Sequence, residues 1–368
     1  MRIVVLVNGP PEKTNGVRAR ALFRDMLTEH EVAFFYRDEL RKWRSTKAFY
    51  QAINQSSPDI IYVEQIGYAG ILAALGGKLR HRARVILSTG DAVYAFAKSA
   101  MNVAQAQLMG AMEFVALRMA DAIIICGALH HKQLLERRGF RNLFWIPGGV
   151  DTSLFKPMDV SELRAELGLA DKLTIGVVGS INLNKKYEFC YGWEVVEVVR
   201  RFKGLPVVGL VVGIGDGVPF LRQKAREYGI EKQIVFRGWV DHDGLPRYLN
   251  LIDICVSTQS NDLVGQVRIT AKIPEYLACG RYIIASDVGG AREFVRESGL
   301  LLECRGVKDD AYVESIASHV KRIYRDRSIL LDGLNGIETA RKYFDYSVLR
   351  PELRRVIDSV RGSYRPRG

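Results

Sequence analysis

Short runs of apolar residues alternate with amphipathic stretches along most of this chain. In the first half, each run holds about five residues and is almost continuously apolar, as a strand buried on both faces of a parallel sheet requires. The predicted strands of this half are 3–7, 32–36, 60–64, 85–88, 122–126 and 143–146. Between them, apolar residues at helical spacing predict helices such as 18–28, 46–54 and 70–79. This alternation is typical of a doubly wound α/β domain.

The second half repeats the pattern. Its predicted strands are 173–178, 207–212, 234–236, 254–256, 282–285 and 300–302, with helices such as 188–201, 220–228 and 268–279. Segment 147–157 is rich in turn residues, and beyond residue 309 the pattern is helical to residue 360. We therefore predict two Rossmann-like domains that face each other across a cleft. They span residues 1–146 and 151–341, and a last helix at about 347–360 packs back on the first domain.

Composition excludes several other classes of protein. Of the 368 residues, 48% are hydrophobic and 26% are charged, which is typical of a globular protein and not of a disordered one. The sequence has no apolar run of about 18 residues, so we predict no membrane span. The apolar run 3–7 is too short for the core of a secretory signal. Five scattered cysteines form no C-x-x-C pair, so we expect a reduced, cytoplasmic protein without a zinc site.

The net charge of +12 is concentrated in the first half. Residues 1–150 carry 20 basic and 12 acidic side chains, a net of +8. Such an excess favours phosphates, anionic lipid or nucleic acid as partners, or is simply a solvated surface. No nucleic-acid-binding module is recognisable, so we predict no nucleic-acid partner. The following basic residues lie among aromatic ones and suggest peripheral contact with an anionic membrane: Arg37, Arg41, Lys42, Arg44 and Lys47.

Glycine-rich turns follow the first strand of each half. Asn8-Gly9 leads to Gly16 in the first half, and Gly179-Ser180 stands in the second. Such turns bring backbone N–H groups and helix N-termini close to anions. The run 213–217 is either a phosphate loop or an ordinary turn. A methionine-rich stretch, 100–119, either lines an apolar acceptor groove or fills a core.

Several further segments occur in a recognisable order: 146–157, 176–179 with Lys185, 212–217, 236–240, 251–257, 272–280 and 283–290. Together they resemble family 4 glycosyltransferases of the GT-B fold, also called glycosyl transferases group 1. The resemblance covers about residues 140–300, and segment 272–280 is similar to the family's K-x-x-E-Y-M-A-x-G helix. It implies transfer of a sugar from a nucleotide-sugar donor, of the UDP or GDP type, to an acceptor hydroxyl. It also implies retention of configuration, no cofactor or metal, and an acceptor that is a glycan, a lipid-linked molecule or a small molecule.

The resemblance also implies roles for individual residues. It gives the donor ribose to Glu275, the diphosphate to Lys185 (or its neighbour Lys186) and the nucleobase to backbone groups of 236–240. Asp91 and Lys185 are the candidate catalytic residues. The candidate donor-binding residues are Gly16, Ser180, Lys185, Arg237, Gly238, Gly265, Gln266, Val267, Arg268, Lys272 and Glu275. A carboxylate near a helix start can accept a pair of hydrogen bonds from a diol, which favours a ligand role for Glu275 over a structural one.

Three positions depart from the family pattern. Ser180 stands where the family has a phosphate-binding arginine, and Arg268, expected at the start of the Glu275 helix, is the candidate substitute. Val267 replaces the first glutamate of the family's E-x7-E pair, and Gly90 replaces a histidine next to Asp91. Two hypotheses therefore remain: an active glycosyltransferase, or a degenerate one that binds nucleotide-sugars or acts as a scaffold.

Overall fold

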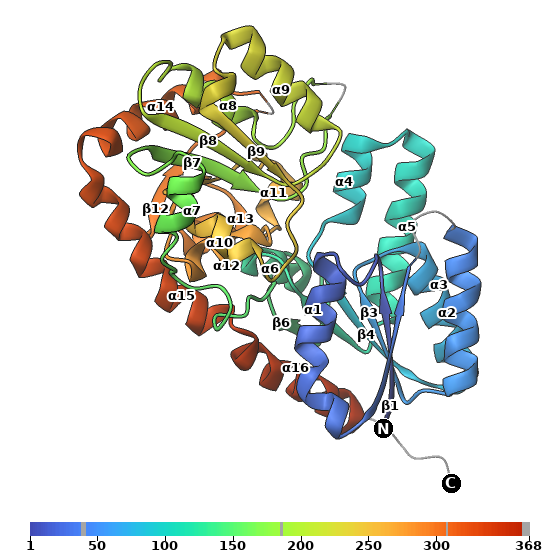
Figure 1. The fold of residues 1–368 in the computed structure, drawn as a ribbon. Coiled ribbons are helices and arrows are strands. Elements are labelled where there is room, and N and C mark those ends of the chain that lie inside the picture. The colour runs from blue at the N-terminus through green and yellow to red at the C-terminus, as the bar shows by residue number, and fades with distance from the viewer. Residues whose placement is uncertain (38–41, 185–186, 307, 363–368) are drawn as a thin grey trace. The chain divides into compact units, whose positions relative to one another are not determined.

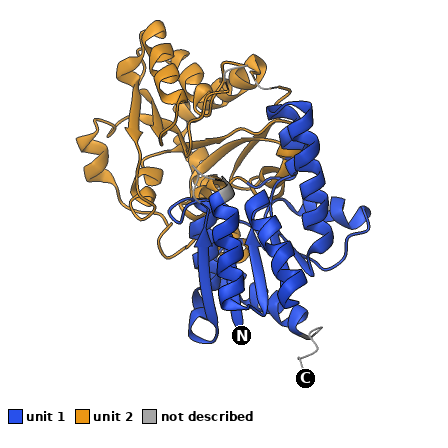
Figure 2. Ribbon diagram, turned by 90° about the vertical axis from the view of Figure 1, so that its right-hand side faces the viewer, with its two compact units in different colours: residues 1–149, 266–269, 344–368 blue, residues 150–265, 270–343 orange. Residues whose placement is uncertain are grey.

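The computed structural model describes residues 1–37, 42–184, 187–306 and 308–362. It divides into two units, shown in Figure 2. Unit 1 consists of residues 1–149, 266–269 and 344–368, and unit 2 of residues 150–265 and 270–343. Each unit contains a six-stranded parallel sheet with flanking helices (Figure 1), so the predicted fold class is confirmed. Segment 266–269 groups with unit 1, although it lies within the predicted second domain, residues 151–341.

The sheet of unit 1 has the strand order β2-β1-β3-β4-β5-β6. Its strands are β1 (Arg2–Val7), β2 (Glu31–Tyr36), β3 (Ile60–Glu64), β4 (Arg84–Thr89), β5 (Ala122–Ile125) and β6 (Leu143–Trp145). The helices are α1 (Thr14–Phe23), η1 (Arg24–Thr28), α2 (Lys42–Ser56), α3 (Tyr68–His81), α4 (Val93–Ala100), α5 (Val103–Met119) and α6 (Leu129–Arg137). Strand order reverses direction between β1 and β3, so the loops that follow these two strands diverge.

Helices cover both faces of this sheet. One face packs with α2, α3 and α5 into a core that contains Phe49, Ile71 and Leu117. The other face packs with α1 and with the last helix, α16 (Tyr346–Gly362). The buried residues of α16 recur at helical spacing: Tyr346, Leu349, Leu353, Val356, Ile357 and Val360. The end of the chain thus completes the core of the unit that contains its beginning.

The sheet of unit 2 has the order β12-β11-β10-β7-β8-β9. Its strands are β7 (Leu173–Val178), β8 (Val207–Val212), β9 (Ile234–Gly238), β10 (Ile254–Ser257), β11 (Tyr282–Ser286) and β12 (Gly299–Leu302). The helices are α7 (Ser161–Glu166), α8 (Trp193–Arg200), α9 (Gly217–Tyr228), η2 (Glu231–Gln233), α10 (Leu245–Asn250), α11 (Leu263–Gln266), α12 (Lys272–Ala278), α13 (Gly289–Phe294), α14 (Asp310–Arg325), η3 (Arg327–Leu334) and α15 (Asn335–Tyr343). This is the strand order of dinucleotide-binding domains, with its reversal between β7 and β10.

Two predicted helices begin later than the sequence pattern suggests. Helix α8 begins at Trp193, because Gly192 before it has a φ of 91°, a left-handed conformation that a helix cannot include. Helix α12 begins at Lys272 and not at residue 268. The carbonyl of Val267 accepts a hydrogen bond from the N–H of Ala128 (2.8 Å), so it takes no part in a helix.

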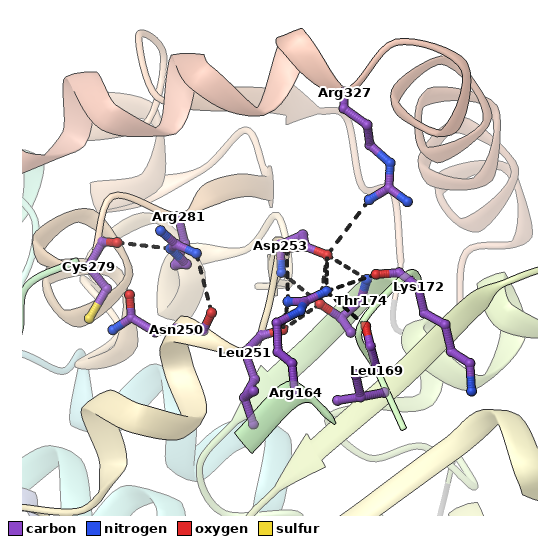
Figure 3. Close-up of polar contacts among 10 residues, drawn as sticks. All are labelled: Arg164, Leu169, Lys172, Thr174, Asn250, Leu251, Asp253, Cys279, Arg281 and Arg327. Atoms are coloured by element: carbon purple, nitrogen blue, oxygen red, sulfur yellow. Dashed lines mark hydrogen bonds and ion pairs between the residues drawn. The ribbon is translucent and has the colours of Figure 1, made fainter. Parts of the chain in front are cut away.

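A polar cluster fastens the amino ends of β7 and β10 (Figure 3). The carboxylate of Asp253 accepts hydrogen bonds from the backbone N–H of Thr174 (2.8 Å) and from its hydroxyl (2.9 Å). Arg164 of α7 pairs with the same carboxylate at 3.3 Å. Ligands of doubly wound sheets bind at the opposite, carboxyl edge. We therefore interpret this cluster as a structural clamp that holds the register of the two strands beside the site.

The role of α16 gives a direct test. Leu353 is fully buried in the core of unit 1, so Leu353→Ala should lower the free energy of unfolding by about 2–5 kcal/mol. Val348 lies on the same helix but is 42% exposed, and Val348→Ala should change it by less than about 1 kcal/mol. Urea unfolding of the three proteins measures both effects. Equal, small changes would contradict the packing role of the helix.

Candidate functional site

The first group of candidate residues lies in unit 2, where β7 and β10 end. Gly179 and Ser180 follow β7 and are both exposed. Gly179 has a φ of 127°, and a Cβ built on it would lie 3.8 Å from the Nζ atom of Lys272. The ammonium group of α12 therefore lies close to the turn that follows β7. An anion held by the backbone of this turn would be within reach of that positive charge.

Aromatic and amide contacts hold Lys272 in this position. Its Nζ atom lies 4.3 Å from the centre of the Tyr191 ring. The hydroxyl of Tyr191 accepts a hydrogen bond from Nε2 of Gln259 (2.7 Å), and the backbone N–H of Gln259 donates to Ser286 (2.7 Å). Burial lowers the pKa of Lys272 to about 8. Among the described residues, Nζ has no hydrogen-bond acceptor, so its donors are available to a ligand.

Two carboxylates share the electrostatic environment of this ammonium group. Burial raises the pKa of Glu275 to about 7, and the charge of Lys272 opposes the shift. Glu194 of α8 is 2% exposed, and burial raises its pKa as well, against a hydrogen bond from Thr258 and the charge of Lys272. Its Oε1 atom is buried without a partner, and the carboxylate of Glu275 has no hydrogen bond within the described residues. The carboxylates can thus accept hydrogen bonds from hydroxyls, while the ammonium group of Lys272 binds an anion beside them.

The predicted glycine positions have packing roles in this structure. A Cβ on Gly213 would lie 1.8 Å from the carbonyl oxygen of Gly179, and the N–H of Gly213 donates to Gly238 (2.8 Å). The glycine at the start of run 213–217 is therefore explained by the close approach of its backbone to the backbone at Gly179. Gly265, expected in a loop, lies in the short helix α11, and its N–H donates to Asp262 (3.0 Å). The exposed Arg237 stacks on Tyr248 at 4.7 Å.

A second group lies in unit 1 after β4. Nε of Arg268 donates a hydrogen bond to Oδ1 of Asp91, and its guanidinium stacks on the Phe96 ring at 5.3 Å. Both side chains of this ion pair remain partly exposed. The prediction put Arg268 at the start of the Glu275 helix. That helix placement is wrong, because α12 begins at Lys272, and in this structure the guanidinium pairs with Asp91.

The two other departures from the family pattern meet around Gly127. A Cβ on Gly127 would lie 2.2 Å from the carbonyl oxygen of Val267 and 2.8 Å from that of Gly90. A Cβ on Gly90 would in turn lie 2.8 Å from Sγ of Cys126. Val267 is fully buried. A histidine at position 90 would therefore collide with Cys126, and a glutamate at position 267 would place a carboxylate in a fully buried position.

Sequence reasoning missed a buried ion pair at the carboxyl edge of the unit 1 sheet. Arg18 of α1 donates to the carboxylate of Glu64 (2.7 Å), to the hydroxyl of Ser88 (3.1 Å) and to the carbonyl of Ile146 (2.7 Å). The available signal was a charged residue at the end of the apolar run 60–64. Glu194 carried the same signal, an acid inside an apolar helix. Gly16, before Arg18, packs against Pro11, since a Cβ would lie 2.3 Å from its oxygen.

Three further candidate residues are Lys185, Lys186 and Gln266. The two lysines lie outside the described residues. Gln266 is the last residue of α11 and the first of segment 266–269, which belongs to unit 1. Among the described residues, no group of three or more His, Cys, Asp or Glu side chains is arranged to hold a metal ion. No helix in the described part of the chain has both the length and the hydropathy of a membrane span.

Comparisons with known proteins agree with the resemblance. Residues 172–326 match the family model described as glycosyl transferases group 1. D-inositol 3-phosphate glycosyltransferase of Rhodococcus erythropolis is 31% identical over 184 residues, which are 48% of this chain and 40% of that protein. A GDP-mannose-dependent phosphatidylinositol monomannoside mannosyltransferase of Mycobacterium tuberculosis is 28% identical over 60% of this chain and 56% of its own. The matched regions thus span about half the length of these relatives.

Solved structures show the same fold over nearly the whole chain. HepE of Anabaena, solved with UDP and glucose, has a TM-score of 0.76 at 17% identity and covers 98% of this chain and 100% of its own. Sucrose-phosphate synthase of Thermosynechococcus elongatus has a TM-score of 0.77 at 18% identity, covering 99% and 100%. The recognised family is therefore confirmed over residues 172–326, and the predicted fold is confirmed over nearly the whole chain.

The raised pKa of Glu275 predicts a pH dependence of stability. The folded chain keeps this proton up to about pH 7, whereas the unfolded chain releases it near the ordinary pKa of 4.5. Between these values the wild type loses up to about 1.4 kcal/mol of unfolding free energy per pH unit, a loss that Glu275→Gln lacks. The stability of Glu275→Gln relative to wild type should thus rise from pH 4.5 to 7.

Urea unfolding at several pH values between 4.5 and 7 measures this difference. Glu297→Gln is the matched control, because Glu297 is an exposed carboxylate of the same unit, and its difference from wild type should stay flat. Parallel stability curves for wild type and Glu275→Gln would contradict the burial of a shifted carboxylate at this site.

Proposed function

We propose that this chain, which belongs through residues 172–326 to the glycosyl transferases group 1 family, transfers a sugar from a nucleotide-sugar donor to an acceptor hydroxyl. One observation carries the proposal. At the strand-order reversal of the family-matched unit, an ammonium group to which the described residues offer no hydrogen-bond acceptor lies close to a glycine turn and to a half-buried carboxylate. A nucleoside diphosphate carries both complementary parts, a diphosphate and a ribose diol.

In the proposed complex, Lys272 and the backbone at Gly179 bind the diphosphate. The family resemblance adds Lys185 to the same task. Glu275 accepts hydrogen bonds from the two ribose hydroxyls, and its pKa falls as these bonds stabilise the ionised form. Negative charge grows on the diphosphate as the bond to the sugar breaks. Fixed positive charge next to it stabilises that transition state, which is the chemical role we assign to Lys272 and Lys185.

We further propose that the reaction retains the anomeric configuration and requires no metal ion. The resemblance supplies the stereochemistry. Asp91 is the carboxylate proposed at the reaction centre, and Arg268 fixes its orientation through their ion pair. Arg268 is thus a positioning residue for Asp91 in place of the phosphate ligand first expected. The alternative is a degenerate member that binds the donor without turnover, since Gly90 and Val267 replace two polar residues of the family.

The acceptor we propose carries a phosphate or another anionic group. The relatives are named for inositol phosphate and phosphatidylinositol acceptors, and residues 1–150 of this chain have a net charge of +8. A basic surface attracts such an acceptor and speeds its encounter. The donor is of the UDP or GDP type. We place the protein in the cytoplasm, with its five cysteines buried and free, and in peripheral contact with anionic membrane.

Donor binding tests the proposed role of Glu275. A panel of UDP, GDP, ADP and their sugars should contain a ligand that raises the melting temperature of the wild type. A hydrogen bond to a charged group contributes about 1.5–3 kcal/mol, so Glu275→Gln should weaken binding of that ligand about 10- to 150-fold. Calorimetric titration measures the affinity, with Glu297→Gln as the control that should bind like wild type. Unchanged affinity of a well-folded Glu275→Gln would remove the residue from the site.

Turnover separates the active enzyme from the degenerate one. The wild type should release nucleoside diphosphate from the preferred sugar donor, and activity should survive EDTA because cationic side chains stabilise the leaving group. Asp91→Asn should keep donor affinity within about twofold and reduce turnover at least 100-fold, within the range of general acid–base or electrostatic effects. Loss of activity in EDTA with recovery in Mg²⁺ would overturn the metal-independent mechanism. Tight donor binding without release would support the degenerate alternative.

A further inference from the structure

Helix α5 has a composition that does not fit its position in the fold. Its sequence, VAQAQLMGAMEFVALRM, is apolar on all sides, as is typical of a helix that is covered all round. Yet one side of α5 is open to solvent. The exposed apolar residues on this helix and just before it, here called the α5 face, are Met101, Val103, Leu108, Phe114 and Val115.

The opposite side of α5 is buried. Its buried residues are Ala106, Ala116, Leu117 and Met119, and the last three belong to the core beneath the sheet of unit 1. Gly110 packs against Tyr94 of α4, which lies beside α5 in Figure 1. One of the two predictions for the methionine-rich stretch 100–119 was that it fills a core. The structure buries only part of this stretch. Nothing within the fold of unit 1 requires the residues of the α5 face to be apolar.

Arginine side chains border one end of the α5 face. The guanidinium of Arg118 stacks on Phe114 at 5.3 Å and on Phe140 at 5.4 Å, which connects the face to the turn after α6. Arg137, Arg138 and Arg141 of that turn are all exposed. An apolar surface next to a cluster of cations matches a bilayer surface, where acyl chains lie beneath anionic headgroups.

Acidic residues near the α5 face have other partners. The carboxylate of Glu113 turns toward α4 and accepts the backbone N–H groups of Val93 (2.8 Å) and Tyr94 (3.1 Å). Glu136 pairs with Lys132 at 2.6 Å. A second copy of the chain that packed symmetrically on this face would bring arginines near arginines without carboxylates to neutralise them. Charge complementarity therefore favours anionic lipid over a homodimer.

We propose that the α5 face docks on an anionic lipid bilayer, with its apolar side chains among the acyl chains and the arginines against the headgroups. This inference rests on the surface of unit 1 and not on the donor site. It assigns membrane contact to α5 and the turn 137–141, where the sequence had suggested the segment 37–47. Docking would hold unit 1 beside acceptors that reside in the membrane.

Vesicle sedimentation of the full chain tests the proposal. The wild type should sediment with vesicles of about 70% phosphatidylcholine and about 30% phosphatidylglycerol. Several-fold less protein should sediment with vesicles of phosphatidylcholine alone. Leu108→Gln with Phe114→Gln should weaken binding at least tenfold. Arg137→Gln with Arg141→Gln should weaken it about 30-fold, or about fivefold per charge, and rising salt should act in the same direction.

Matched controls come from unit 2. Leu331 is 62% exposed, against 65% for Leu108, so Leu331→Gln should bind vesicles like wild type. Lys321→Gln with Arg325→Gln removes two exposed cations of α14 and should also leave binding unchanged, within about twofold. If the double apolar variant melts early, Val103→Gln takes its place, since Val103 is 79% exposed.

Three results would overturn the proposal. They are a wild type that does not bind anionic vesicles, controls that lose as much binding as the α5 variants, and a dimer in solution that Leu108→Gln with Phe114→Gln dissociates without any vesicle binding. Nucleotide affinity of the same variants should equal that of wild type. Failure of membrane docking is therefore distinguishable from failure of the proposed transferase function.

Discussion

A parallel sheet must be covered on both faces, and this requirement organises the whole chain. Unit 1 forms its sheet from the first 149 residues, but α1 covers only part of one face. The remaining cover comes from α16, after the chain has built all of unit 2. The core of unit 1 therefore combines residues more than 300 positions apart, such as Leu22 and Leu353. An exposed ion pair of Asp25 with Arg350, at 3.1 Å, also joins the two ends of the chain. Cutting the chain before α16 would expose that face to water.

The same constraint directs polar groups to the sheet edges. Since both faces of each sheet are apolar, charged side chains collect where strands end. In unit 2, Asp253 and Arg164 fasten the amino edge, while Lys272, Glu275 and Glu194 gather at the carboxyl edge. At the amino edge each carboxylate oxygen has partners, whereas at the carboxyl edge Glu194 retains an unpaired oxygen. An unsatisfied buried group costs stability, so an unpaired oxygen beside Lys272 and Glu275 is consistent with a site shaped for a ligand.

Sequence patterns predicted the strands well, because a buried parallel strand is a local, nearly continuous apolar run. They failed where tertiary contacts decide. Nothing in segment 268–271 signals that α12 begins at Lys272, since the reason is a hydrogen bond between Ala128 and Val267. The apolar neighbours of Glu194 in the sequence were a signal, but they did not decide its burial, because a surface helix and a buried one can both carry a glutamate. The role of Glu275 came from motif resemblance, and its half-buried position with a raised pKa is what the structure adds.

The departures at positions 90 and 267 lie close together, because the backbone oxygens of both residues approach Gly127. A Cβ at position 90 would lie 2.8 Å from Sγ of Cys126, and the Val267 side chain is fully buried. A larger polar side chain at either position would therefore have to displace packed neighbours or be buried. Beside this packed cluster, the Asp91–Arg268 pair supplies partly exposed charge that the lost residues no longer provide. If the packed cluster around Gly127 served stability alone, a partly exposed ion pair beside it would not be needed. Its presence favours an altered reaction centre over an abandoned one.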